Sequence, residues 1–308
     1  MKILLTGGSG MVGSNVLIHP MSAKHEIIAP SRNELNLLIY SEVQNYINLN
    51  NPDVVIHAAG IVGGIQANIK NPVKFLVENM DMGRNVIMAS RKANIKKLIN
   101  LGSSCMYPRN AKNPLSESLI LQGELEPTNE GYAIAKIFAA RLCEYINKED
   151  NSFLYKTVIP CNLYGFYDKF DPNHSHMLPA VIRKISDAKE SNKNTVEIWG
   201  NGEAKREFMF AQDLVDFIYL SIEKIEELNQ NTNVGLGRDY TINQYYNAIA
   251  EVIGYNGNFV HDLTKPEGMK QKLIDSNRAY QLGWKPKTNL KTGIKKTYNY
   301  YLKEILKQ

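Results

Sequence analysis

A glycine-rich turn directly after the first apolar run constrains the fold of this chain most strongly. Residues 2–6, K-I-L-L-T, have the composition of a short buried strand, and the next residues space Gly7, Gly10 and Gly13 as G-x-x-G-x-x-G. Here Gly7 permits a tight turn, Gly10 a close backbone approach to a pyrophosphate, and Gly13 close packing of a helix on the strand. A strand, a glycine loop and a helix in this order predict a dinucleotide-binding unit.

Strand-like and helix-like segments alternate over the first half of the chain, without hairpin signals between the strands. This alternation predicts a parallel sheet with helices on both faces, a Rossmann-type doubly wound α/β fold. The expected strands are 2–6, 25–31, 53–60, 96–104 and 155–165. The expected helices are one that begins near Gly13 and breaks near Pro20, and those at 41–51, 72–94 and 130–149.

The character of the sequence changes after about residue 165. The segment F-Y-D-K-F-D-P-N-H-S-H-M-L-P is polar and holds two prolines, which predicts a long functional loop. Beyond it we expect helices at 177–193 and 241–254 and a strand, turn and strand at 194–210. The predicted domains are a nucleotide-binding domain over 1–165, to which later segments near 210–250 return, and a smaller α/β substrate-binding lobe over 166–308.

Composition narrows the class of protein. The chain has 308 residues, 44% of them hydrophobic and 22% charged, with a formal net charge of +5, as in ordinary globular proteins. Without long basic runs or an 18-residue apolar stretch, neither a nucleic-acid nor a membrane partner is expected. The odd cysteine count without a C-x-x-C pair indicates neither a disulfide framework nor a metal site. Together with the lack of a signal-peptide pattern, this predicts a cytoplasmic protein.

The end of the second expected strand bears on which dinucleotide is bound. It reads A-P-S-R-N-E and offers Ser31 and Arg32 where NAD sites tend to place an acidic residue on the ribose. A guanidinium suits a 2′-phosphate through charge-assisted hydrogen bonds, which favours NADP(H). The alternative for Arg32 is a solvated surface arginine.

A tyrosine and a lysine lie four residues apart in Y-A-I-A-K, so Tyr132 and Lys136 share a helix face. An ammonium near a phenol favours the phenolate, so we expect Lys136 to lower the pKa of Tyr132. The phenol could then protonate a carbonyl oxygen as hydride arrives at its carbon, with Ser103 bonded to the same oxygen. The predicted cofactor-binding residues are Gly7, Gly10, Met11, Val12, Gly13, Ser31, Arg32, Ala58, Ala59, Tyr132 and Lys136.

Several motifs together resemble the extended short-chain dehydrogenase/reductases, and within them the GDP-L-fucose synthases. They are V-G-G-I-Q-A-N-I-K-N-P, L-G-S-S-C-M-Y-P, L-E-P-T-N-E-G-Y-A-I-A-K-I, N-L-Y-G, N-H-S-H-M-L-P-A and K-R-E-F. The resemblance implies NADPH-dependent reduction of the C4 ketone of a GDP-4-keto sugar, coupled to C3/C5 epimerisation, in a homodimer. It implies a reductive triad of Ser103, Tyr132 and Lys136, with Cys105 and His176 as epimerisation base and acid.

Cys105 and His176 each have a competing interpretation. Free cysteines are often buried fillers, and a redox role is a third possibility for Cys105. A thiol two residues beyond Ser103 can point the same way from a strand end, where a positive neighbour would favour the thiolate. His174 competes with His176 for the acid role.

The resemblance also implies a sugar-nucleotide pocket, and the sequence departs from the family around it. Gly131 stands where proline is common, Lys184 where a second arginine follows Arg183, and G-M-K-Q-K-L is unusual near Lys272. The substrate is therefore open: alternatives are a C4-reductase acting on a GDP-4-keto-heptose or another GDP-4-keto sugar, or a catalytically silent NADP-binding regulator. The predicted substrate-binding residues are Ser104, Asn162, His176, Lys184, Trp199, Arg206 and Lys272.

Overall fold

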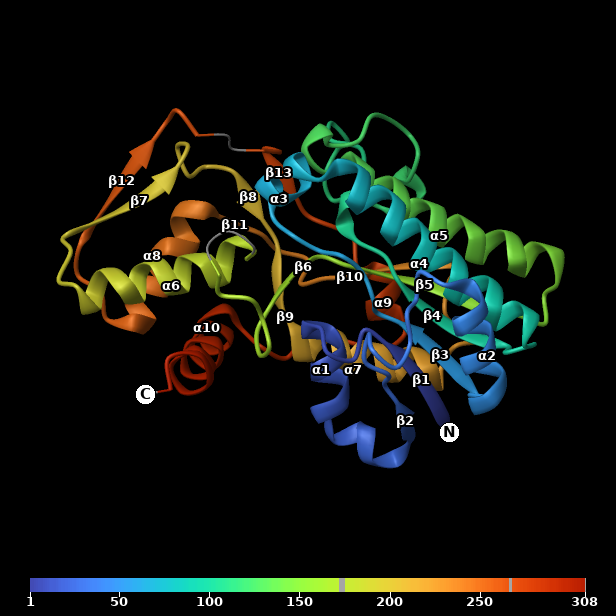
Figure 1. The fold of residues 1–308 in the computed structure, drawn as a ribbon. Coiled ribbons are helices and arrows are strands. Elements are labelled where there is room, and N and C mark those ends of the chain that lie inside the picture. The colour runs from blue at the N-terminus through green and yellow to red at the C-terminus, as the bar shows by residue number, and fades with distance from the viewer. Residues whose placement is uncertain (172–174, 266–267, 308) are drawn as a thin grey trace.

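Six parallel strands form the centre of the larger domain in the computed structural model (Figure 1), which describes residues 1–171, 175–265 and 268–307. The strands are β1 Lys2–Thr6, β2 Glu26–Ile28, β3 Val54–His57, β4 Lys97–Leu101, β5 Leu154–Pro160, β6 Asn162–Tyr164, β7 Thr195–Trp199, β8 Lys205–Arg206, β9 Phe208–Phe210, β10 Asn231–Val234, β11 Tyr240–Thr241, β12 Asn258–Asp262 and β13 Gln271–Lys272. The α-helices are α1 Met11–Ile18, α2 Tyr40–Asn50, α3 Ile65–Lys70, α4 Pro72–Lys92, α5 Glu130–Glu149, α6 Met177–Glu190, α7 Ala211–Glu223, α8 Ile242–Ile253, α9 Asn277–Gln281 and α10 Leu290–Tyr300.

The central sheet has the strand order β10–β5–β4–β3–β1–β2, and every pair in it is parallel. Both of its faces are apolar because alternate side chains of a strand point to opposite sides. In β1, Ile3 and Leu5 pack into one hydrophobic core, whereas Leu4 between them packs into another. The predicted Rossmann-type doubly wound α/β fold is thus confirmed.

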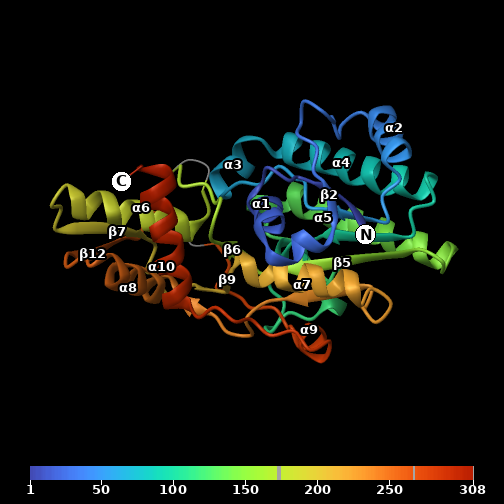
Figure 2. The ribbon, with the colours of Figure 1, turned by 90° about the horizontal axis from the view of Figure 1, so that it is seen from below.

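Helices cover both faces of this sheet. On one face α4 lies between α2 and α5 and packs against both, and on the other face α1 packs against α7 (Figures 1 and 2). The helix α5 begins and ends where the sequence predicted it, at Glu130 and Glu149. Among the described residues no helix is long and apolar enough to cross a membrane.

The second lobe has a hydrophobic core of its own, built from α6, α8, α10 and the strands beside them. Its two small sheets pair β12 with β7, and β8 with both β11 and β13. Of the segments expected to return to the first domain, α7 and β10 lie on the central sheet, whereas α8 packs against α6 and α10. The division at residue 165 stays a proposal, which the separate cores support.

One predicted strand is divided in two. The sequence predicts one strand with a loop over 155–165, but β5 ends at Pro160 and, after Cys161, Asn162–Tyr164 form β6, which pairs with β9 instead. Proline has no N–H with which to extend a ladder, and the chain leaves the sheet there. This departure carries the chain from the sheet toward the second lobe and brings β6 beside β9.

Candidate active site

The predicted catalytic serine lies just beyond the carboxyl end of β4. Gly102 follows the strand, and a Cβ there would lie 3.0 Å from the Met106 sulfur and 3.1 Å from Ile159, so a larger residue would crowd the turn. Ser103 is extended and begins a short 3-10 turn, Ser104–Met106, in which the Cys105 amide donates to the Ser103 hydroxyl at 3.3 Å. Ser103 and Cys105 are therefore held by one turn, and Ser104 between them is buried.

The helix α5 brings Tyr132 and Lys136 to this turn. The Lys136 ammonium is buried and donates a hydrogen bond to the Leu101 carbonyl at 2.9 Å. Its nitrogen lies 5.8 Å from the centroid of the Tyr132 ring, and the phenol is hydrogen-bonded to the Ser103 side chain. The structure therefore brings Ser103, Tyr132 and Lys136 together.

The pKa of Tyr132 differs from the one expected from the sequence, and that of Lys136 is shifted as well. Burial raises the pKa of Tyr132 above its ordinary value, and the nearby Cys105 raises it further, whereas the hydrogen bond to Ser103 acts the other way. Burial also lowers the pKa of Lys136 to about 8. The predicted lowering of the tyrosine pKa by lysine is wrong for this structure, because burial and the charge of Cys105 raise this pKa and only the hydrogen bond to Ser103 lowers it. Tyr132 is a protonated phenol at neutral pH, the form that can give a proton away.

Cys105 is partly exposed and contacts two side chains from distant parts of the chain. The Asn129 amide nitrogen donates to its sulfur at 3.2 Å, and the Lys272 ammonium lies 3.9 Å from the same atom. Lys272 is buried, so its charge is little screened by water. The positive neighbour that a thiol base requires is present, although the sequence had assigned Lys272 to the sugar-nucleotide pocket.

His176 belongs to the second lobe, where it precedes the first residue of α6. Burial, and to a smaller extent the charge of Lys169, lower the pKa of its imidazole, which favours the neutral ring. Within the described part of the chain no hydrogen bond joins His176 to Cys105 or Tyr132. Its rival, His174, lies outside the described residues. The acid role of His176 stays a prediction.

Two cationic pocket residues are adjacent across a strand pair. Arg206 of β8 and Lys272 of β13 are in register in the parallel ladder, so their side chains leave the same face. Burial lowers the pKa of Arg206, and the carboxylate of Glu126 opposes that shift. Asn162 of β6 is tied to the same region, because its amide donates to the Glu207 carbonyl at 3.0 Å.

A buried carboxylate holds the segments that carry these residues. Glu207 accepts from the Gly237 amide at 2.9 Å and from the Ile274 amide at 3.1 Å, and burial raises its pKa to about 7. It follows Arg206 directly, and Ile274 lies two residues beyond Lys272. The sequence analysis missed Glu207, although a glutamate within K-R-E-F, beside a predicted pocket arginine, was an available signal.

The remaining predicted pocket residues form a separate pair on α6 and β7. Lys184 donates to the Glu197 carbonyl, and the Trp199 indole donates to the Glu197 carboxylate at 2.9 Å. Burial lowers the pKa of Lys184. Trp199 is 47% exposed, and the Lys265 ammonium lies over its ring, 5.8 Å from the centroid. Lys184 and Trp199 lie near each other, but no described contact joins them to Cys105 or Tyr132.

The glycine loop has the shape that a dinucleotide needs. Gly7 has a φ of +79°, and a Cβ there would lie 2.7 Å from the Ala59 backbone, at the end of β3. A Cβ at Gly13 would overlap the Gly7 carbonyl, so this glycine permits α1 to pack on the loop. At Gly10 a Cβ would meet the Gly7 oxygen alone, at 3.3 Å, and would otherwise fill open space before the N-terminus of α1. A phosphate group fits such a cradle.

The predicted ribose end of this site is an exposed turn after β2, with Ser31 and Arg32 at the surface. The Ser31 amide donates to the Glu34 carboxylate at 2.7 Å, and this bond lowers the pKa of Glu34. Glu34 was not considered from the sequence, although it ends the same A-P-S-R-N-E run. Among the described residues no cluster of three or more potential metal-binding His, Cys, Asp or Glu is present.

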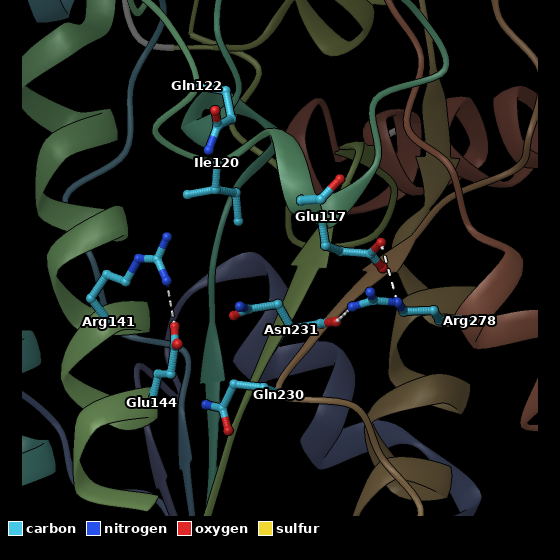
Figure 3. Close-up of a pocket in the computed structure, with 9 residues that line it drawn as sticks. Glu117, Ile120, Gln122, Arg141, Glu144, Gln230, Asn231 and Arg278 are labelled. Carbon is cyan, nitrogen blue, oxygen red and sulfur yellow. Dashed lines mark hydrogen bonds and ion pairs between the residues drawn. The ribbon is translucent and has the colours of Figure 1, made fainter. Parts of the chain in front are cut away.

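A separate hollow of about 230 Å³ lies beside the middle of α5 and the edge strand β10 (Figure 3). It contains none of the predicted site residues. Its charged side chains are already paired, Arg141 with Glu144 at 2.6 Å and Arg278 with Glu117 at 3.5 Å. We therefore place the candidate site at the carboxyl ends of the strands, not in this hollow.

The glycine loop makes a paired prediction. Gly13→Ala should reduce the free energy of unfolding by about 1–3 kcal/mol, because the new methyl group overlaps backbone that cannot move aside. Gly10→Ala should leave stability nearly unchanged but weaken NADPH binding at least tenfold, because its methyl group enters the phosphate cradle. Urea unfolding and fluorescence titration with NADPH measure the two effects. Full-strength NADPH binding by Gly10→Ala would contradict the assignment.

Comparison with known proteins agrees with this geometry. The NAD dependent epimerase/dehydratase family model matches residues 3–237. GDP-L-colitose synthase of Yersinia pseudotuberculosis is 59% identical over 304 residues, 99% of each chain. GDP-L-fucose synthase of Azorhizobium caulinodans is 49% identical over 98% of this chain and 96% of that protein.

The solved structures agree as well. A GDP-6-OMe-4-keto-L-xylo-heptose reductase from C. jejuni has a TM-score of 0.91 at 31% identity over 98% of both chains. The resemblance inferred from the sequence motifs is confirmed by these matches. This chain belongs to the NAD-dependent epimerase/dehydratase family.

Proposed function

We propose that this protein uses NADPH to reduce the C4 ketone of a GDP-4-keto sugar and couples this step to C3/C5 epimerisation. The observation that carries the proposal is the joint placement of a Ser103-bonded phenol, a buried ammonium and a partly exposed thiol on one turn and one helix. Relatives named GDP-L-colitose and GDP-L-fucose synthase, over nearly the full length, support the substrate class.

In the reduction, NADPH supplies a hydride to C4 of the sugar. The ketone oxygen becomes an alkoxide as the hydride adds, and Tyr132 donates its phenolic proton to that oxygen. Ser103 turns its one hydroxyl proton from the phenol to the same ketone oxygen and orients it. The Lys136 ammonium then balances the charge that remains on the phenolate, and the Leu101 carbonyl keeps it in place.

In the epimerisation, the C4 ketone acidifies the hydrogens on C3 and C5. Cys105 removes one of them as a thiolate, and the electron pair moves onto the ketone oxygen as an enolate. A proton delivered to the opposite face of the same carbon completes the inversion, and we assign that delivery to His176. The Lys272 ammonium near the sulfur supports the first half of this assignment.

The charge of the pocket supports a nucleotide diphosphate. Arg206 and Lys272 are adjacent, with Lys272 buried and Arg206 half-buried, so positive charge is concentrated here, which suits a pyrophosphate. For the cofactor, the exposed guanidinium of Arg32 supports NADP(H) over NAD(H). Localisation in the cytoplasm stays a prediction.

The second candidate function is reduction at C4 without epimerisation, on a GDP-4-keto-heptose. The full-length structural likeness to a protein named as a reductase of such a heptose favours it. A thiol with two donors on its sulfur favours the first candidate, because reduction alone does not require that arrangement.

Two substitutions separate the two half-reactions. Tyr132→Phe should retain NADPH binding but slow oxidation of NADPH by a GDP-4-keto sugar at least a hundredfold, because no proton reaches the C4 oxygen. Cys105→Ser should abolish incorporation of solvent deuterium at C3 and C5 while direct C4 reduction survives. Absorbance at the reduced-nicotinamide band measures the reduction, and NMR of the product measures deuterium incorporation. If the unmutated enzyme incorporates no deuterium, it is a reductase alone. If it oxidises no NADPH with any GDP-4-keto sugar, both candidate functions are refuted.

The buried lysine makes a pH prediction. The Lys136 ammonium is the form that stabilises the tyrosinate, and its pKa is about 8, so the rate of C4 reduction should fall as pH rises, about tenfold between pH 8 and 9.5. Lys136→Arg keeps its charge over this range, so any activity that it retains should be independent of pH there. A parallel alkaline decline in both proteins would show that another group is responsible.

Apolar side chains on the outer face of α4 and α5 support the proposed homodimer, in which these helices pair with those of a second copy. Val73 and Val77 on α4 are 71% and 45% exposed, and Ile134 and Tyr145 on α5 are 40% and 55% exposed. We expect Val77→Glu to shift the protein to the monomer in sedimentation velocity. Leu49→Glu, which changes an 86% exposed leucine on α2, should leave the dimer intact. A monomeric parent protein would refute the proposal.

A further inference from the structure

Asn129 occupies the N-cap of α5 without capping it. Asparagine is favoured at this position because its side-chain oxygen accepts from a free amide of the first turn, which is worth about 1 kcal/mol. In this structure Asn129 makes no such bond. Its amide nitrogen donates instead to the Cys105 sulfur at 3.2 Å. The side chain is thus directed away from its usual structural role and toward the thiol.

The side-chain oxygen of Asn129 indicates that this side-chain orientation costs free energy. The Asn129 carbonyl oxygen is buried and has no hydrogen-bond partner in the described part of the chain. Leaving a buried acceptor unsatisfied costs about 1–3 kcal/mol. A purely structural asparagine would recover part of this cost by turning its oxygen to the helix amides. Such unrelieved costs concentrate at functional positions.

A second donor reaches the Cys105 sulfur from a segment far along the chain. The Lys272 ammonium of β13 lies 3.9 Å away, whereas Asn129 and Cys105 belong to the first domain. The charge of Cys105 raises the pKa of both Lys136 and Tyr132, so it attracts the ammonium and opposes a phenolate. A thiolate accepts hydrogen bonds better than a thiol does, so two donors aimed at one sulfur suit a position where a thiolate has to form during a reaction.

We propose that Asn129 is a positioning residue that fixes the Cys105 sulfur and prepares it to act as a base. This inference rests on the proposed epimerisation and names a residue that acts on it. Asn129 also lies three residues before Tyr132 on the same helix start, so one element places both the phenol and the support of the thiol. The helix α5 therefore sets the distance between the proposed base, Cys105, and the proposed proton donor, Tyr132.

The substitution Asn129→Asp tests this proposal, because it separates structure from reactivity. Aspartate has the same shape, is a good N-cap residue and suits the positive end of a helix, so folding stability should be unchanged or higher. Its carboxylate cannot donate to sulfur and repels a thiolate. We expect alkylation of Cys105 by iodoacetamide at pH 7.5 to slow at least tenfold. Cys143 and Cys161 are buried and will not contribute under native conditions.

A matched control is Asn289→Asp, since Asn289 is the N-cap of α10 and does accept from the Thr292 amide, at 2.9 Å. This control should alkylate at the parental rate. In the catalytic assay, Asn129→Asp should lose solvent deuterium incorporation at C3 and C5, and the same change in a Cys105→Ser background should have no further effect on it.

The outcomes distinguish the inference from the function on which it rests. Parental alkylation of Cys105 in Asn129→Asp, with the protein folded, overturns the positioning role whatever the enzyme does. Slowed alkylation, with normal deuterium incorporation in Cys105→Ser, supports the contact between Asn129 and sulfur but refutes epimerisation by this thiol. Slowed alkylation together with lost incorporation in both variants supports both.

Discussion

The hydrogen bond from the Lys136 ammonium to the Leu101 carbonyl ties the centre of the sheet to the helix that carries Tyr132. Leu101 is the last residue of β4, and Lys136 lies one turn after Tyr132 on α5. Because the ammonium is buried, a misplaced strand end would leave a charge without a partner, which is far more costly than a lost surface contact. The position of the phenol over Ser103 follows from this bond.

Much of the first domain could be predicted from the sequence because its signals are local. The strand β1 and the helices α4 and α5 have long or strongly patterned apolar faces, and the glycine loop requires its backbone shape whatever the rest of the chain does. The strands β6, β8 and β13 could not be predicted well, since each has two or three residues and is defined by a partner far away in the sequence. No periodicity is visible in so short a segment.

In the candidate site, too, local patterns could be predicted and contacts between distant segments could not. Ser103, Tyr132 and Lys136 could be predicted because two lie one helical turn apart and the third ends a strand. The pKa of Tyr132 was predicted in the wrong direction, since a spacing of four residues reveals a neighbour but not the loss of water around it. The contact of Lys272 with Cys105 spans 167 residues, and only the tertiary fold reveals it. Asn129 was missed because its side chain departs from the capping role that its position suggests.

The buried Glu207 carboxylate joins the strand that carries Arg206 to the segment after Lys272, and its own carbonyl anchors Asn162. Arg206, Lys272 and Asn162 are therefore held in one hydrogen-bonded frame. Within this frame none of the strands β8, β13 and β6 can shift alone. Lys184 and Trp199 lie outside this frame, on α6 and β7. Divergence toward a new sugar nucleotide would thus be easiest at that outer pair, where replacements leave the frame intact. Under the proposed function, such a division of the pocket would let the sugar specificity change while the reaction is kept.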